Sequence, residues 1–117
     1  MGDIVSRPET IICDIDGVIF MHHGDITQQH LIKPVVLPGV IKTFQTWDLK
    51  GCALILITGR RESTRAHTER QLAEAGIIYD TLVMGVTGGR RVLINDGKAD
   101  KTISTTYSLQ VERNVGL

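Results

Sequence analysis

Residues 10–18 read TIICDIDGV, an apolar run that ends in acidic residues and a glycine. A short apolar run bounded by turn residues is typical of a buried strand, and we predict one over residues 10–14. Asp14 and Asp16 stand at its end, and Gly17 supplies a turn. If the chain turns just after Asp14, the Asp14 side chain and a nearby backbone carbonyl can face one cation. A functional site is therefore expected at this strand end.

The rest of the chain alternates helices and strands. Helices are predicted over residues 39–50 and 62–75. Further strands are predicted over four runs, residues 53–57, 81–84, 92–94 and 103–109. Such alternation predicts an α/β fold with a mainly parallel sheet. We expect one Rossmann-like domain, residues 1–117, in which residues 18–37 form only a flap or short hairpin.

Length and composition fit one globular domain. The 117 residues are 42% hydrophobic and 22% charged, with 13 basic and 13 acidic side chains. This balance gives no general attraction to nucleic acid or to an anionic membrane. No apolar run approaches the ~20 residues of a membrane span, and no basic start precedes an apolar stretch, so a cytoplasmic protein is expected. Cys13 and Cys52 are expected to be free, buried thiols in a reducing compartment, and a disulfide between them is the alternative.

Two further strand ends carry polar residues. The second strand ends in Thr58-Gly59-Arg60, where a hydroxyl and backbone N–H groups at a helix start suit an anion. The fourth ends in Asn95-Asp96. In parallel sheets, ligands bind beyond the carboxyl ends of the strands. An all-oxygen ligand set favours Mg²⁺, held by one or two carboxylates and a substrate phosphate, so the sequence predicts phosphoryl transfer.

These strand ends also carry a resemblance to a known family. DIDGV at residues 14–18, LITGR at residues 56–60 and LIND at residues 93–96 occur in this order. They resemble motifs I, II and IV of the haloacid dehalogenase superfamily of phosphatases, and the resemblance covers about residues 10–110. It implies a Mg²⁺-dependent phosphomonoester hydrolase that acts through an aspartyl-phosphate intermediate.

The resemblance implies a role for each matching residue. Asp14 would be the nucleophile, and its other oxygen would bind Mg²⁺. Asp16 would be the general acid and base, with its backbone carbonyl on the metal. Thr58 would hydrogen-bond the transferring phosphoryl group beside the Gly59 amide. Asp96 would complete the metal shell.

The sequence departs from the family pattern in two ways. Only six residues, 86–91, separate the third and fourth predicted strands, so the helix that normally begins with the motif III lysine has no room. One of three basic residues would replace that lysine: Arg90, Arg91 or Lys98. We favour Arg91. Asn95 stands where paired acids are common, so both Asn95 and Asp96 are candidates for the metal shell.

Basic residues near the strand ends are the predicted substrate contacts. Arg60 and Lys98 would bind anionic groups of the substrate. Arg60 is also the first of four arginines that either bind these anionic groups or form a solvated helix face, whose positive charge is offset by glutamates. The four are Arg60, Arg61, Arg65 and Arg70. His22 and His23 are predicted to lie on a solvated flap rather than to bind a metal.

The short chain leaves no room for the cap domains of many relatives. The site is therefore expected to be open or to be closed by a neighbour in a homo-oligomer. The resemblance is nearest to small capless phosphatases of capsule and surface-sugar synthesis, which implies a small-molecule phosphate ester such as a sugar phosphate. The zero net charge argues against the alternative substrate, a nucleic-acid end.

Two other classes of protein are alternatives. One is a catalytically weak or inactive binding module that retains the fold. The other is a response-regulator receiver domain, which would need its acceptor aspartate at the end of the third strand. That position reads Val83-Met84-Gly85, which argues against a receiver.

Overall fold

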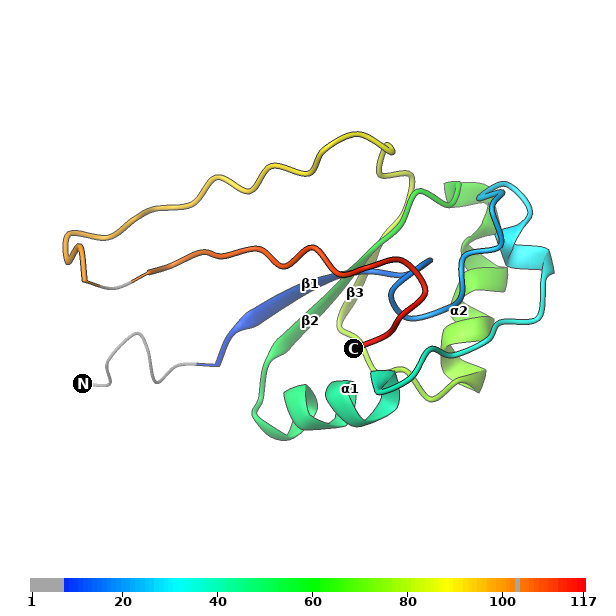
Figure 1. Ribbon diagram of the computed structural model, residues 1–117, viewed down its shortest axis with the longest axis horizontal. Helices are drawn as coiled ribbons and strands as arrows, with labels where there is room; N and C mark the ends of the chain where they lie inside the picture. Colours follow the sequence, from blue (N-terminus) through cyan, green and yellow to red (C-terminus); the bar gives the residue numbers. More distant parts are fainter. Residues whose placement is uncertain (1–7, 103) are drawn as a thin grey trace.

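The computed structural model describes residues 8–102 and 104–117, and these form a three-stranded parallel sheet with two helices (Figure 1). The elements in chain order are β1 (Thr10–Asp14), η2 (Gln29–Leu31), α1 (Val40–Leu49), β2 (Ala53–Ile57), η3 (Glu62–Thr64), α2 (Arg65–Glu74) and β3 (Thr81–Val83). The strand order is β1-β2-β3. The predicted α/β class is confirmed.

The carboxyl ends of the three strands lie in register. Asp14 of β1 pairs with Ile57 of β2, and Ile57 pairs in turn with Val83 of β3. The pairing continues past the strands, because the Val86 N–H donates to the Thr58 carbonyl over 2.9 Å. The loops that follow β1, β2 and β3 therefore begin at one edge of the sheet, as expected for a parallel α/β fold.

One face of the sheet is buried under both helices. Side chains alternate between the faces along each strand. The inward-facing strand residues share one apolar core with residues of both helices: Cys13, Leu54, Leu56 and Leu82 with Val40, Phe44 and Leu72. On the opposite face Ile12 is 47% and Val83 is 42% exposed, so this face has a much thinner cover.

The predicted helices are confirmed to within a few residues. α1 begins after Gly39, which adopts a left-handed φ of 78°. Glycine is required there, because a Cβ would stand 2.5 Å from the Leu117 carbonyl oxygen. The second helical segment begins with η3, continues as α2 and ends before Gly76, whose φ of 75° suits a helix C-terminus.

The predicted strands 92–94 and 103–109 are wrong. Residues 92–94 and 104–109 contain no strand, and residue 103 lies outside the described residues. Residues 88–102 and 104–112 instead run out and back as two extended limbs, which we call the arm (Figure 1). Its apolar run is open to solvent, with Val92, Leu93 and Ile94 exposed by 73, 63 and 90%.

The length of the link after β3 explains this difference. A fourth strand beside β1 would have to begin at the opposite end of the sheet, ~15 Å back along it, and ~14 Å across it. Residues 84–91 span at most ~28 Å when fully extended. The link would have almost no slack to pass around the sheet, and the chain continues outward instead.

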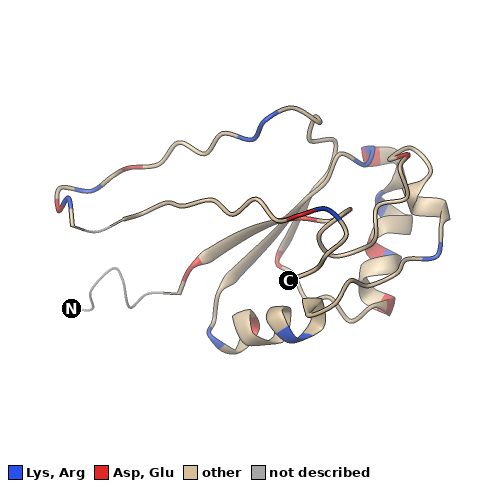
Figure 2. Cartoon of the chain, viewed as in Figure 1, with Lys and Arg blue, Asp and Glu red and all other residues tan. Residues whose placement is uncertain are grey.

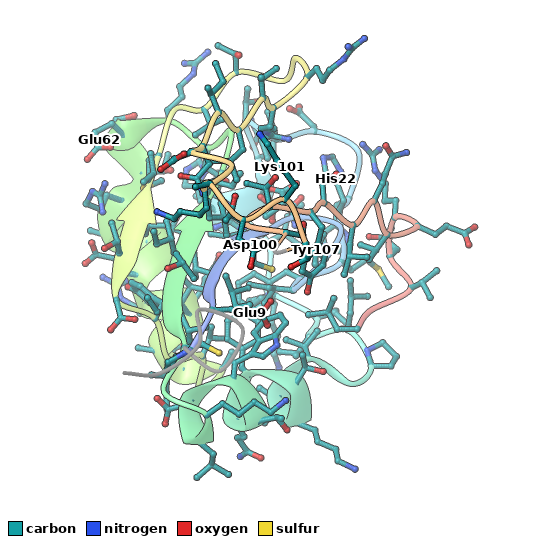
Figure 3. All side chains as sticks on the ribbon, turned by 90° about the vertical axis from the view of Figure 1, so that its left-hand side faces the viewer. Glu9, His22, Glu62, Asp100, Lys101 and Tyr107 are labelled. Carbon is teal, nitrogen blue, oxygen red and sulfur yellow. The ribbon has the colours of Figure 1, made fainter. Side chains whose placement is uncertain are left out.

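The far turn of the arm carries charges of both signs (Figure 2). Lys98 Nζ lies 3.6 Å from Asp96 Oδ2. Asp96 and Asp100 each accept a backbone N–H two residues further along, over 2.9 Å in both cases. Figure 3 looks onto this turn, with Asp100 and Lys101 in front, and Tyr107 lies on the returning limb with 69% exposure. Asp96 therefore belongs to a solvated turn.

The predicted flap, residues 18–37, is anchored in the core at both ends. Ile19, Phe20 and Leu37 are at most 4% exposed. The Leu37 N–H donates to the Ile19 carbonyl over 2.9 Å, and Phe20 forms an isolated antiparallel bridge with Val36. The segment is thus a closed loop over the end of the sheet.

The C-terminal residues pack against this loop. The Asn114 N–H donates to the Gly17 carbonyl over 2.8 Å, and the Leu117 N–H donates to the Pro38 carbonyl over 3.0 Å. The Asn114 side chain accepts the His22 N–H over 2.7 Å and donates to the His22 carbonyl over 3.2 Å. These bonds hold residues 113–117 beside the loop that follows β1.

The cysteines are both free, with Cys13 buried and Cys52 half-buried. Within residues 8–102 and 104–117, no helix has the length and apolarity needed to span a membrane.

Candidate functional site

A cleft of about 510 Å³ lies at the carboxyl ends of the strands. Its volume is in the range of small-ligand sites. The loops after β1, β2 and β3 line it, and the first limb of the arm and the C-terminal segment add one arginine each: Asp14, Asp16, His22, Ile26, Gly59, Arg61, Gly85, Val86, Thr87, Gly88, Arg91 and Arg113. Two of the three predicted strand ends, those of β1 and β2, thus meet at one cleft.

Asp14 is half-buried at this cleft, and one of its oxygens is free. Its Oδ1 accepts the Ile15 N–H over 2.9 Å, whereas no donor from the described part of the chain reaches Oδ2. Burial is the main cause that raises the pKa of Asp14, and the charge of Asp16 raises it further. The Ile15 hydrogen bond and the positive charges of Arg91 and His22 act in the opposite direction. A free carboxylate oxygen facing cations suits a nucleophile or a metal ligand.

Asp16 is held by a buried arginine. Arg60 Nε donates to Asp16 Oδ2 over 2.9 Å and Nη2 donates to Oδ1 over 2.8 Å, with side-chain exposures of 1% and 3%. Arg60 Nη1 donates to Thr68 Oγ1 over 3.1 Å and to Gln71 Oε1 over 2.6 Å. Four of the five guanidinium N–H groups are therefore used inside the protein. The prediction that Arg60 binds substrate is wrong, because Arg60 is a buried positioning residue for Asp16.

The same network reaches the loop over the sheet. Gln71 Nε2 donates to the carbonyls of His30 and Ile32 over 3.1 and 3.0 Å. Gln71 is buried on α2, and Asp16 is buried after β1. Buried, satisfied networks of this kind rigidify the elements that they join. Asp16, α2 and the loop around His30 are thus fixed relative to one another.

Thr58 and Gly59 lie in different environments at the end of β2. Thr58 is fully buried, and its Oγ1 accepts the Arg60 N–H over 3.1 Å. Gly59 lines the cleft, and a Cβ there would lie 3.2 Å from the Val86 carbonyl oxygen. The loop after β3 thus crosses close over Gly59. The structure brings Gly59 to the cleft surface and leaves the Thr58 hydroxyl beneath it.

Among the three candidates for the missing lysine, the structure places only Arg91 at the cleft. Arg91 is close enough to Asp14 to lower its pKa. Arg90 and Lys98 are exposed and are not among the described residues that line the cleft. Lys98 pairs with Asp96 at the far turn of the arm, so this structure brings neither of these two predicted site residues to Asp14.

Arg113 is a cleft residue that the sequence did not reveal. Its Cγ would lie 3.3 Å from a Cβ at Gly17, so its side chain crosses directly over the turn after Asp14. The two-way hydrogen bonds between Asn114 and His22 fix the backbone next to it. Arg61 and His22 also line the cleft. Among the described residues, no carboxylate lies within ion-pair distance of Arg61, Arg91 or Arg113.

The donors at the cleft fit Mg²⁺ in a minimal form. Mg²⁺ commonly binds one or two carboxylates, a substrate phosphate and several waters. Among the described residues, no donor reaches Asp14 Oδ2 and no backbone N–H donates to the Asp16 carbonyl, so these two oxygens are the available ones. Within the described ranges, no group of three His, Cys, Asp or Glu residues comes together, because Asp96 lies on the arm.

Comparisons with known proteins relate the chain to part of an RNA repair assembly. No protein-family model and no curated protein match the sequence. A solved chain of the Pnkp1/Rnl/Hen1 complex is similar to it, with 30% identity and a TM-score of 0.60 over 74% of this chain and 31% of that chain. A chain of the Pnkp1/Rnl/Hen1 RNA repair complex shows 28% identity and a TM-score of 0.58 over 78% of this chain and 30% of that chain. The protein therefore spans less than a third of the solved chains that it resembles.

Proposed function

We propose that this protein hydrolyses phosphomonoesters at the Asp14 cleft, as its resemblance to haloacid dehalogenase phosphatases implies. The observation that carries the proposal is the free Oδ2 of Asp14 in a cleft that it shares with Arg61, Arg91 and Arg113. A phosphomonoester is largely a dianion at neutral pH. Three arginines with no acidic partner among the described residues suit such a group, because guanidinium pairs well with phosphate oxygens.

The proposed reaction has two steps. In the first, Asp14 Oδ2 attacks phosphorus, the bond from phosphorus to the ester oxygen breaks, and the leaving oxygen takes a proton. In the second, water attacks the aspartyl-phosphate, which releases inorganic phosphate and regenerates the Asp14 carboxylate. Asp16 is the proposed proton donor and acceptor, and Arg60 holds its carboxylate in place. Arg91 is proposed to stabilise the negative charge that develops on the phosphoryl oxygens.

Mg²⁺ is the proposed cofactor, because it would neutralise the repulsion between the phosphate and the carboxylates. Asp14 and the Asp16 carbonyl would hold it. Asp96 would join them only if the arm folded back toward the cleft. The high exposure of Val92, Leu93 and Ile94 favours such a movement, because contact with the rest of the protein would bury them.

Two substrate classes are candidates. A sugar phosphate or related small metabolite follows from the resemblance to capless phosphatases. A terminal phosphate on a nucleic acid is favoured by the similarity to chains of an RNA repair complex. The three arginines also concentrate positive charge locally, although the whole chain has no net charge.

A substrate panel tests the proposal. The purified protein with Mg²⁺ should release phosphate from p-nitrophenyl phosphate and from at least one class among sugar phosphates, mononucleotides and oligonucleotides with terminal phosphates. Chelation of divalent cations should remove the activity. No release from any of these compounds would refute the enzyme proposal and leave the inactive binding module as the better interpretation.

Replacement of Arg113 should weaken substrate binding. We expect Arg113→Ala to raise KM for a phosphomonoester about tenfold, because a charge-assisted hydrogen bond contributes about 1.5–3 kcal/mol. Glu112→Ala is a matched control, since Glu112 precedes Arg113 and does not line the cleft. Steady-state kinetics of both variants are the measurement. An unchanged KM in Arg113→Ala would exclude Arg113 from the substrate site.

A pair of variants tests whether Asp96 takes part in metal binding although it lies on the arm. Asp96 and Asp100 are both exposed and both accept the N–H two residues further along. We expect Asp96→Asn to lower kcat at least about tenfold and to raise the Mg²⁺ concentration needed for activity, whereas Asp100→Asn should do neither. Equal activities of the two variants would show that the cleft works without Asp96.

A further inference from the structure

A second pocket adjoins the Asp14 cleft. It has a volume of about 270 Å³ and is lined by residues of the loop after β1 and of the segment that begins α2: Ile26, Thr27, His30, Arg61, Ser63, Thr64 and His67. Ile26 and Arg61 line both the pocket and the cleft. A molecule with its phosphate at Asp14 can therefore extend past Arg61 into this pocket.

Two histidine rings form one wall of the pocket. The rings of His30 and His67 meet edge to face, with centroids 5.4 Å apart and planes at 79°. His30 Nδ1 is buried and has no hydrogen-bond partner among the described residues. A buried polar atom without a partner destabilises the folded protein, which calls for a reason other than stability.

The pocket is rigidly connected to the candidate nucleophile turn. Gln71 donates to the His30 carbonyl and accepts from Arg60, which in turn holds Asp16. The distance from the pocket wall to the cleft is thus fixed by buried hydrogen bonds rather than by a mobile loop. A subsite at a fixed distance from a reacting group selects substrates by what is attached to the phosphate.

We propose that this pocket binds the nucleoside that carries the terminal phosphate of a single-stranded nucleic acid, with Arg61 on the phosphodiester that links this nucleoside to the next one. This inference rests on the proposed phosphatase function and narrows its substrate class. Histidine rings stack on nucleobases, and hydroxyls such as those of Thr27, Ser63 and Thr64 bond ribose and phosphate oxygens. Arg61 has no carboxylate partner in the described part of the chain, so its charge is available to a phosphodiester.

Binding to catalytically inactive protein tests the pocket independently of turnover. The Asp14→Asn protein is titrated, by fluorescence anisotropy, into a labelled short oligonucleotide with a terminal phosphate at either end. Adding His67→Ala should weaken binding about tenfold, because a stacked base contributes about 1–3 kcal/mol. Arg70→Met is the matched control, since Arg70 is an exposed residue of α2 that lines neither cavity.

Kinetics supply the second readout. In the active protein, His67→Ala should lower kcat/KM for the oligonucleotide relative to kcat/KM for p-nitrophenyl phosphate about tenfold. An equal fall for both substrates, or a sugar phosphate preferred over the oligonucleotide, would overturn the nucleoside proposal while leaving the phosphatase proposal intact. If the wild-type protein hydrolysed neither p-nitrophenyl phosphate nor any other compound of the panel, the phosphatase proposal would be refuted, and the anisotropy experiment would still decide whether the pocket binds nucleic acid.

Discussion

Replacing Asp14 with asparagine is expected to lower phosphomonoester hydrolysis at least about a thousandfold, the scale seen when an enzyme loses its nucleophile. Asn has nearly the same shape, but its amide is a poor nucleophile and cannot carry the phosphoryl group. Initial rates with p-nitrophenyl phosphate and Mg²⁺ measure the effect. Asp48→Asn, an exposed change on α1, is the control and should keep full activity.

The same variant has an opposite effect on stability. Burial raises the pKa of Asp14 above its usual value, so the ionised form is less favourable in the folded than in the unfolded protein. The carboxyl group therefore contributes stability at pH values below its pKa in the unfolded chain, and this contribution is lost as the pH rises through its pKa in the folded protein. Asp14→Asn should therefore raise the melting temperature at neutral pH and lose this advantage in acid. An active variant, or one less stable at neutral pH, would contradict this role of Asp14.

Replacing Arg60 with methionine is expected to lower the free energy of unfolding by about 3–5 kcal/mol, because it leaves Asp16 as an uncompensated buried charge. Thr68 and Gln71 would also lose their donor. Urea denaturation measures the effect. Arg70→Met, an exposed change on α2, is the matched control and should stay within about 0.5 kcal/mol of wild type.

A double-mutant cycle distinguishes the ion pair from general disruption of the core. Asp16→Asn in the Arg60→Met background removes the unpaired charge, so the double variant should be more stable than Arg60→Met alone. If Arg60→Met is too unstable to purify, recovery of soluble protein in the double variant is the readout. Additive losses, or an Arg60→Met protein as stable as Arg70→Met, would show that the pair does not hold Asp16.

The central part of the fold could be predicted because local signals agree there. The strand bounds 10–14 and 53–57 follow from apolar runs closed by polar turns, and both helices end near glycines. The run at residues 92–94 has the same composition, but its pairing depends on the reach of the link before it. The types of residue in a segment do not indicate whether the preceding link is long enough to bring that segment to the sheet. The prediction of a strand over residues 92–94 was therefore wrong.

Three residues that the sequence singled out, Asp14, Gly59 and Arg91, line one cleft in the structure. Asp14 and Gly59 follow from strand ends, whereas Arg91 was chosen among three basic residues of the region after the third strand. Arg60 was misassigned because a sequence motif does not show that a charged side chain points into the core. Arg113 was missed because it follows Asp14 by 99 positions in the chain and reaches the cleft only through the bonds of its neighbour. A weak signal was present, since an asparagine and a glycine close behind an arginine indicate a turn that can present it.

Detection of an aspartyl-phosphate at Asp14 is the most direct test of the central claim, that Asp14 is the nucleophile of a phosphatase. The protein is mixed with excess phosphomonoester and Mg²⁺, quenched in acid within milliseconds, digested and examined by mass spectrometry. We predict that the peptide containing Asp14 gains the mass of one phosphoryl group, and that the Asp14→Asn protein gains none. Phosphate release without any phosphorylated peptide, or a phosphoryl group on another residue, would contradict the assignment of Asp14 as the nucleophile.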